Sequence, residues 1–123
     1  MIYKTRNFAR WARKTGLTDS LLETAVLEIY RGLLGADLGG GIVKKRIALP
    51  GRGKRGSTRT LLATNRDDRW FFVFGFGKNE RENISELELA TLKKIAKDLL
   101  GLSDTQIAVA VGEGSLVEVE HEA

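Results

Sequence analysis

Two segments near the start of the chain carry apolar residues at the spacing of an amphipathic helix. They cover residues 7–14 and 19–34, and each has polar residues on the opposite face. Either Thr18 or Ser20 can cap the second helix, and Ser20 has the capping-box spacing to Glu23. The apolar faces consist of Phe8, Trp11 and Ala12 in the first segment, and of Leu22, Ala25, Val26, Ile29 and Leu33 in the second.

Three extended segments follow, at residues 42–49, 58–64 and 70–76. The first (IVKKRIAL) ends at Pro50 and Gly51, which stop a strand. The third (WFFVFGF) is apolar on both faces, which is typical of a central strand. Because the connections between these segments are short, we expect the strands to pair in an antiparallel manner.

The C-terminal part returns to a helical pattern and then becomes acidic. A helix is predicted over residues 86–100, where Ser85 and Glu88 have the spacing of a capping box. A short helix over 104–111 and an edge strand over 116–120 are expected to follow. Helices before and after a run of consecutive strands predict an α+β fold, a twisted, mainly antiparallel sheet with helices packed on it.

The charge of the chain is segregated. Residues 101–123 contain five acids and no Lys or Arg, so residues 1–100 hold all 20 cations against 11 acids. Residues 38–66 hold eight cations and no acid. A body this basic suggests a polyanionic partner, although a basic surface also serves solubility alone.

Composition restricts the chemistry and the architecture. A chain of 123 residues predicts one domain. No stretch approaches ~20 apolar residues, so we expect neither a membrane span nor a secretory signal. The absence of cysteine removes thiol chemistry, and a single histidine, His121, removes histidine pairs and triads. We expect no metal and no cofactor, and any general acid or base must come from Lys, Arg, Tyr, Asp or Glu.

The stretch GRGKRGSTR (residues 51–59) is the strongest candidate for a phosphate-binding site. Its glycines let backbone N–H groups approach an anion, and its cations suit phosphate contacts. If the strands are neighbours, we expect four cations to converge at one end of the sheet: Arg46, Lys54, Arg59 and Lys78, the last in phase with Phe72, Phe74 and Phe76. The alternative is a hairpin loop with solvated charges. A dinucleotide site is disfavoured, because GRGKRG is followed by a strand and not a helix.

The segments KRIALPGRGKRGSTRTLLA and FGFGKNE, followed by a capped helix, resemble the RelE/ParE superfamily of bacterial toxins, and most closely its HigB-like branch. The resemblance covers residues 1–102 as a toxin domain and leaves 103–123 as an acidic C-terminal extension of the same domain. It implies a RelE-like fold and the toxin of a type II toxin–antitoxin system. Such a toxin is cytoplasmic, and its antitoxin is a helix-turn-helix DNA-binding protein.

The resemblance also implies an activity, the metal-independent cleavage of mRNA on the ribosome by attack of a ribose 2′-OH on the adjacent phosphate. The catalytic residues that it implies are Lys54, Arg59 and Lys78. Like charges near Lys54 are expected to lower its pKa from ~10.4 toward that of a base. The RNA-binding residues are expected to be Lys44, Arg46, Arg52, Arg55 and Phe76, whose ring lacks a hydroxyl and is expected to stack on a base.

Two other functions remain open at this level. A ParE-like poison of DNA gyrase uses the same fold and predicts no RNA cleavage. A non-enzymatic nucleic-acid binding module predicts binding with a steep salt dependence but no growth arrest. A further hypothesis concerns the acidic tail, which either shields the basic groove in part or only pairs with an exposed edge of the sheet.

Overall fold

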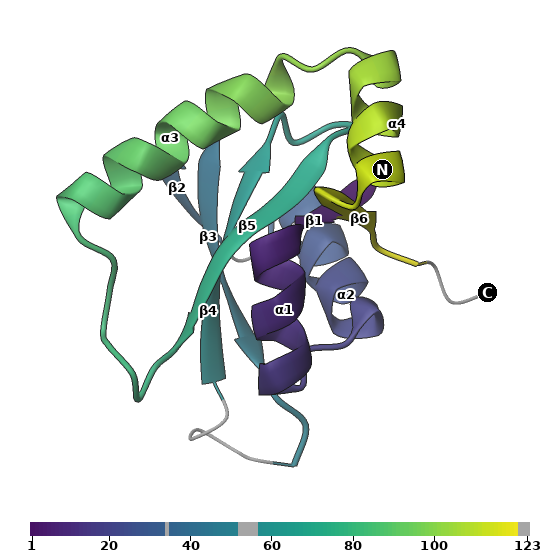
Figure 1. The fold of residues 1–123 in the computed structure, drawn as a ribbon. Coiled ribbons are helices and arrows are strands. Elements are labelled where there is room, and N and C mark those ends of the chain that lie inside the picture. Colours follow the sequence, from purple (N-terminus) through teal and green to yellow (C-terminus); the bar gives the residue numbers. More distant parts are fainter. Residues whose placement is uncertain (34, 52–56, 121–123) are drawn as a thin grey trace.

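The protein folds around one sheet with helices on both faces (Figure 1). The computed structural model describes residues 1–33, 35–51 and 57–120. In these ranges the strand order is β2-β3-β4-β5-β1-β6, and each pair is antiparallel except β1 with β5. The strands are β1 (Ile2–Thr5), β2 (Ala36–Gly39), β3 (Ile42–Ala48), β4 (Ser57–Thr64), β5 (Trp70–Gly77) and β6 (Leu116–Glu118).

The helices divide the buried apolar side chains into two clusters. One cluster lies between α1 (Arg6–Thr15), α2 (Asp19–Tyr30) and one face of the sheet. The other lies under α3 (Glu86–Leu100) and α4 (Asp104–Glu113) on the opposite face. This arrangement confirms the predicted α+β class with a mainly antiparallel sheet. No helix in the described ranges has the length and apolar character needed to span a bilayer.

The predicted cap of α3 is present, whereas both ends of α2 need correction. The Ser85–Glu88 capping box is present at α3, as predicted. At α2 the cap is Thr18, whose side chain accepts a hydrogen bond from the Leu21 N–H, so the Ser20 alternative is wrong. The helix also ends at Tyr30 and not at residue 34, because Gly32 takes a positive φ of 76°. Leu33, predicted in the buried stripe, is consequently 57% exposed.

Two short strands were not predicted. β1 precedes α1 and pairs in parallel with β5, so it occupies the position between β5 and β6. β2 follows α2 and pairs with the first residues of β3. Each has four residues. Such a segment is too short for its own alternation to distinguish a strand from a loop, and only its neighbours in the folded sheet determine its state.

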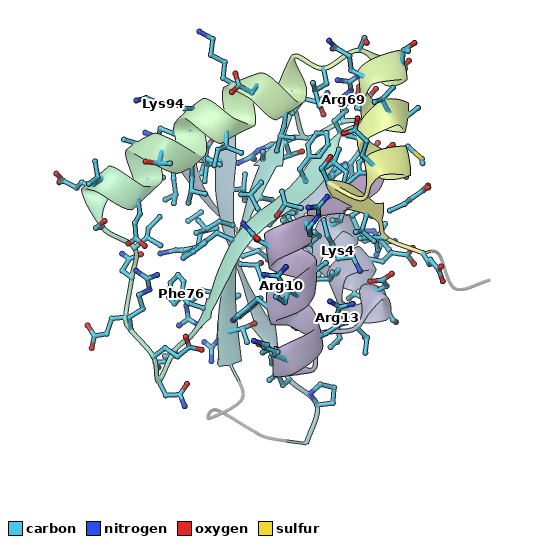
Figure 2. All side chains as sticks on the ribbon, viewed as in Figure 1. Lys4, Arg10, Arg13, Arg69, Phe76 and Lys94 are labelled. Atoms are coloured by element: carbon cyan, nitrogen blue, oxygen red, sulfur yellow. The ribbon has the colours of Figure 1, made fainter. Side chains whose placement is uncertain are left out.

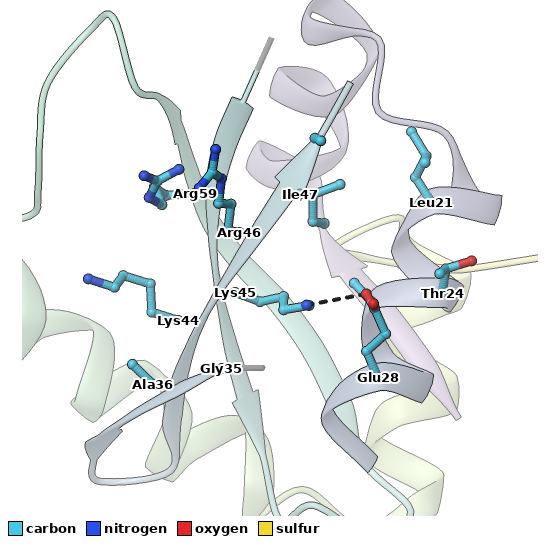
Figure 3. Close-up of a pocket in the computed structure, with 12 residues that line it drawn as sticks. Leu21, Thr24, Glu28, Gly35, Ala36, Lys44, Lys45, Arg46, Ile47 and Arg59 are labelled. Carbon is cyan, nitrogen blue, oxygen red and sulfur yellow. Dashed lines mark ion pairs between the residues drawn. The ribbon is translucent and has the colours of Figure 1, made fainter. Parts of the chain in front are cut away.

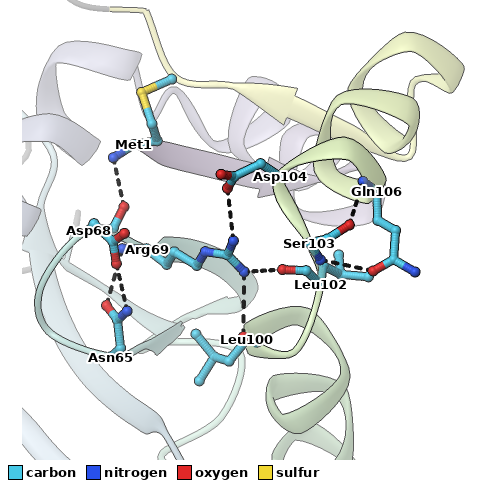
Figure 4. A network of polar contacts seen from close by, with 9 residues as sticks. All are labelled: Met1, Asn65, Asp68, Arg69, Leu100, Leu102, Ser103, Asp104 and Gln106. Atoms are coloured by element: carbon cyan, nitrogen blue, oxygen red, sulfur yellow. Dashed lines mark hydrogen bonds and ion pairs between the residues drawn. The ribbon is translucent and has the colours of Figure 1, made fainter.

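The acidic C-terminal segment is an integral part of this fold. β6 pairs with β1, which confirms the predicted edge strand, and Val119 beyond it is 2% exposed in the cluster under α1 and α2. Arg69 joins α3 to α4, because its guanidinium donates hydrogen bonds to the carbonyls of Leu100 and Leu102 and lies 3.0 Å from the Asp104 carboxylate (Figure 4). Two strands, β5 and β1, separate β6 from β4. For residues 103–120 the shielding hypothesis is therefore wrong, and His121 lies outside the described residues.

Candidate nucleic-acid interface

The candidate site is built on three neighbouring strands at the end of the sheet away from the C-terminal part of α3. Arg46 of β3 lies directly opposite Arg59 of β4, and Arg59 lies opposite Phe76 of β5. All three side chains belong to the face that α3 covers only in part. The backbone of Gly41 lies beneath Leu100, so α3 closes the other end of this face. Arg46 is therefore exposed and Arg59 half-buried.

Arg46 and Arg59 share one hydrogen-bond acceptor. The Ser57 hydroxyl accepts from Arg46 Nε at 2.7 Å and from an Arg59 terminal nitrogen at 3.1 Å, and Ser57 itself is 2% exposed. Figure 3 shows the two guanidinium groups side by side beyond β3. Within the described residues neither arginine forms an ion pair with a carboxylate. Like charges directly opposite on adjacent strands are destabilising, so this arrangement favours an added anion.

The strand alternation separates the three consecutive cations of β3. Lys44 and Arg46 lie on the open face, as predicted, and Lys45 points to the α2 side. The Lys45 ammonium lies 3.2 Å from the Glu28 carboxylate, and Lys45 is 2% exposed. A pocket of about 700 Å³ wraps this edge of the sheet and includes Lys44, Arg46 and Arg59 in its lining. Lys45 is therefore a structural ion-pair partner, and the other cations remain accessible.

Lys78 follows β5 and is placed near this cluster by its main chain. Its N–H donates a hydrogen bond to the carbonyl of Ser57 at 3.3 Å, and its side chain is exposed. The predicted phase of this strand is partly wrong. The β4–β5 register shifts between Leu61 and Leu62, so Phe72 faces α1 and not the side of Phe74 and Phe76. The bulge shifts the alternation along β5 by one residue, so Phe72 joins the core under α1 while Phe74 and Phe76 join the opposite one.

Three predicted site residues, Arg52, Lys54 and Arg55, lie outside the described residues. They belong to the connection between β3 and β4, whose flanking ends carry Arg46 and Ser57. Their predicted roles in catalysis and RNA binding therefore remain predictions. Within the described residues, no group of three or more Asp, Glu or His side chains is placed to hold a metal ion.

Arg81 is a component of the site that sequence reasoning missed. Its guanidinium lies 5.2 Å from the ring centroid of Phe74 and 5.4 Å from that of Phe76. Two hydrogen bonds, of 2.7 and 2.8 Å, join it to the Glu88 carboxylate. The hydrogen bond from the Ser85 N–H, followed by that from Arg81, holds the pKa of Glu88 below its ordinary value. Glu88 therefore stays charged to a lower pH than an isolated glutamate would, and its ion pair with Arg81 persists over the same range.

The position of Arg81 corrects the prediction made for Phe76. Phe76 is 1% exposed, so its ring has no free face for a base. Its ring instead supports Arg81, whose side chain is exposed. The sequence did not reveal this arrangement, because Arg81 lies in the irregular segment between β5 and α3, where there is no periodicity to follow. Its partner Glu88 lies seven residues later, in the first turn of α3.

These features define the chain as a small basic α+β protein with paired arginines on an open sheet face. The family model described as "RelE toxin of RelE / RelB toxin-antitoxin system" matches residues 1–119. The chain therefore belongs to the RelE toxin family and is a toxin of a toxin–antitoxin system, with a cognate antitoxin as its partner. No curated protein matches the chain. The family match extends through β6, beyond the predicted boundary at residue 102.

Proposed function

We propose that this toxin is a metal-independent, ribosome-dependent mRNA endonuclease that stops translation. The observation that carries the proposal is the Arg46–Arg59 pair, in which two guanidinium groups share the Ser57 hydroxyl and have no described carboxylate partner. Guanidinium groups bind phosphate oxygens in a bidentate manner, and two of them at one point suit a phosphodiester whose negative charge grows during cleavage.

The reaction proposed is an intramolecular transesterification at one phosphate of the RNA strand. The 2′-oxygen of a ribose attacks the adjacent phosphorus, the bond to the 5′-oxygen breaks, and the products are a 2′,3′-cyclic phosphate and a 5′-hydroxyl. The proton leaves the 2′-OH for a base and a proton is delivered to the 5′-oxygen. Arg46 and Arg59 bind oxygens of the same phosphate, where Arg59 stabilises the growing charge on the equatorial oxygens, and Lys44 binds the strand beside it.

The proton transfers are assigned to lysines on the basis of the family pattern. We propose Lys54 as the base or positioning cation and Lys78 as the group near the leaving oxygen, and the main-chain bond from Lys78 to Ser57 supports this placement. Arg52 and Arg55 are proposed as further phosphate contacts. Phe76 contributes by supporting Arg81, whose guanidinium plane is a platform on which a base can stack.

The family pattern also supports a biological setting for this activity. The basic loop and the late Lys-Asn-Glu are typical of the HigB-like branch, in which we place the protein. Its antitoxin is then a helix-turn-helix DNA-binding protein, and the pair acts in the bacterial cytoplasm. We treat residues 103–123 as an extension of the toxin domain, which the packing of Ile107, Leu116 and Val119 supports for the part that is described.

The activity is tested by expressing the wild type and Arg59→Ala in bacterial cells and mapping mRNA 5′ ends by primer extension. The wild type is expected to give discrete cuts in register with codons, and Arg59→Ala is expected to give none. Lys94→Ala, which changes an exposed cation of α3, is the matched control and should cut like the wild type. Growth arrest without cuts by the wild type would contradict the proposal and would point to a gyrase poison.

A further inference from the structure

One edge of the Arg81 guanidinium carries two hydrogen-bond donors that have no role in the cleavage proposed above. Its Nη1 atom donates both hydrogen bonds to the Glu88 carboxylate, at 2.7 and 2.8 Å. Among the described residues, neither Nε nor Nη2 has a hydrogen-bond partner. The N–H groups of these two nitrogens point the same way along one edge of the planar group, so they form a fork for two adjacent acceptors.

Contacts on three sides hold this fork in place. The Arg81 N–H donates a hydrogen bond to the carbonyl of Gly77, the last residue of β5, at 3.4 Å. The guanidinium lies over two rings of β5, 5.2 Å from the centroid of Phe74 and 5.4 Å from that of Phe76. Glu88, which holds Nη1, belongs to the capping box at the start of α3. The fork is therefore preorganised, and little side-chain entropy is lost when it binds a ligand.

The fork is a close neighbour of the arginine pair. Arg59 lies opposite Phe76 in the register of β4 and β5, and side chains in such positions have Cβ atoms about 4.5–5.5 Å apart. Figure 2 shows Phe76 between the end of β5 and the segment that leads to α3, which carries Arg81. In RNA a base is separated from its phosphate by one ribose. A strand whose phosphate binds at Arg46 and Arg59 can therefore place a base at Arg81.

The charges of the two places suit different parts of a nucleotide. Arg46 and Arg59 have no carboxylate partner among the described residues, so they attract a phosphate. Arg81 is neutralised by Glu88 at 2.7 Å, although its side chain remains 38% exposed. The adjacent carboxylate opposes a second anion, but it leaves the donors of the fork available. The fork therefore suits an uncharged pair of acceptors, which the edge of a base provides.

Only one RNA base matches two adjacent donors. Guanine presents O6 and N7 as acceptors on one edge, and this edge is the usual partner of an arginine fork. Adenine has an amino group in place of O6, which would face an N–H group of Arg81. Cytosine and uracil lack N7. The outer face of the guanidinium can stack on any base, so stacking gives no preference, and a preference has to come from the edge.

We propose that Arg81 is the specificity-determining residue of the site and selects a guanine next to the phosphate held by Arg46 and Arg59, through hydrogen bonds from Nε and Nη2 to O6 and N7. This inference rests on the proposed function, because it assigns a base preference to the same RNA site. Cleavage on the ribosome is then expected at codons that carry a guanine beside the broken bond.

The test measures binding of the full-length toxin to short uridine oligonucleotides with one central guanine, adenine or 7-deazaguanine. All riboses carry a 2′-O-methyl group, so the strand cannot be cleaved by its own 2′-oxygen. We expect the wild type to bind the guanine oligonucleotide at least about tenfold more tightly than the adenine one, as a bidentate arginine–guanine contact allows. The 7-deazaguanine oligonucleotide, which keeps O6 but lacks N7, should bind more weakly than the guanine one.

A substitution at Arg81 separates base recognition from charge. Arg81→Lys keeps the positive charge beside Glu88 but has no fork, so it should bind the guanine and adenine oligonucleotides with nearly equal affinity. Arg66→Lys is the matched control, because Arg66 is another exposed arginine in an ion pair, with Asp37, beyond the far end of β4. The control should keep the wild-type preference. The 7-deazaguanine comparison tests the same contact without any substitution.

The outcomes separate this inference from the proposed function. Equal affinity of the wild type for the three oligonucleotides, or no binding to any of them, overturns the inference. A preference that survives in Arg81→Lys also overturns it, as does an equal loss of affinity for all three, because Arg81 would then contact phosphate. A wild type that prefers guanine through Arg81 but cuts no mRNA on ribosomes supports the inference and contradicts only the endonuclease.

Discussion

Arg46 and Arg59 occupy positions that a purely structural role would not favour. Their side chains meet across adjacent strands, and Ser57 satisfies one nitrogen of each. An opposed pair of like charges costs about 0.2–1 kcal/mol relative to neutral residues. Lys45 on the same strand shows the opposite case, since its buried ammonium has Glu28 as a partner. The protein thus neutralises the cation that supports the fold, and among the described residues the open pair has no carboxylate partner.

Removing one charge from this pair should therefore leave the fold intact. Arg59→Gln is expected to change the free energy of unfolding by no more than a few tenths of a kcal/mol or to stabilise the protein by up to about 1 kcal/mol, because like-charge repulsion is relieved. Urea denaturation measures this change. A loss of more than about 2 kcal/mol would indicate that Arg59 is a structural residue whose buried partners are left unsatisfied.

Gly75 of β5 allows the Trp11 ring of α1 to pack directly against the backbone of the strand. Gly75→Ala would place a methyl group 2.2–2.7 Å from three atoms of the Trp11 ring, and the shift needed should cost about 1–3 kcal/mol. Gly112→Ala is the matched control, because no atom lies within 4 Å of its new methyl group. Thermal unfolding should show a lower midpoint for the first variant only. Equal midpoints would mean that α1 is not seated on β5 as described.

At the scale of the elements, local chemistry determined most of what could be predicted. The 3.6-residue periodicity placed the helices, and the alternation of β3 placed Lys44 and Arg46 on one face. What could not be predicted depended on tertiary contacts. The bulge in β4–β5 moved Phe72 to the other face, and Arg81 reached Phe74 from an irregular segment. The choice between two possible caps of α2 was also unresolved, because both have suitable side chains.

The caps give a direct test at this scale. Ser85→Ala removes a side chain that accepts the Glu88 N–H, and it should destabilise the protein by about 1 kcal/mol. Ser20→Ala changes a serine that lies within α2, one residue after its start, and it should be neutral or stabilise the protein by a few tenths of a kcal/mol, because alanine is the better helix former. Chemical denaturation of both variants provides the comparison. A larger loss for Ser20→Ala would mean that α2 begins at a different residue.

At the scale of the whole molecule, the N-terminal and C-terminal strands pair with each other and complete one side of the sheet. β1 lies between β5 and β6, so the first and last strands meet at one side of the sheet. This pairing joins residues more than 100 positions apart, as in the contact of Val119 N–H with the carbonyl of Ile2 at 2.9 Å. No local pattern encodes such a partner, which is why the α+β class could be predicted and the position of β1 could not. The acidic tail consequently supports the fold at the edge away from the arginine pair.

A pair of valines in this tail tests that role. Val119→Ala should cost about 1–2 kcal/mol, because it removes the equivalent of two buried methylene groups from the core under α1 and α2. Val117→Ala, two residues earlier and 36% exposed, should cost much less. Unfolding of the two variants in urea gives the difference. If both are neutral, the segment is an appendage, and its removal should not affect the stability of the toxin.

The central claim of the account is that Arg46 and Arg59 act on one phosphodiester. It is tested most directly by a double-mutant cycle, in which single-turnover cleavage of mRNA on programmed ribosomes is measured for the wild type, Arg46→Ala, Arg59→Ala and the double variant. We expect Arg59→Ala to lose about 10²-fold in rate. The double variant should lose at least tenfold less than the product of the two single effects, because each change disables the same site. Losses that multiply fully would contradict the claim, since the two arginines would then act independently.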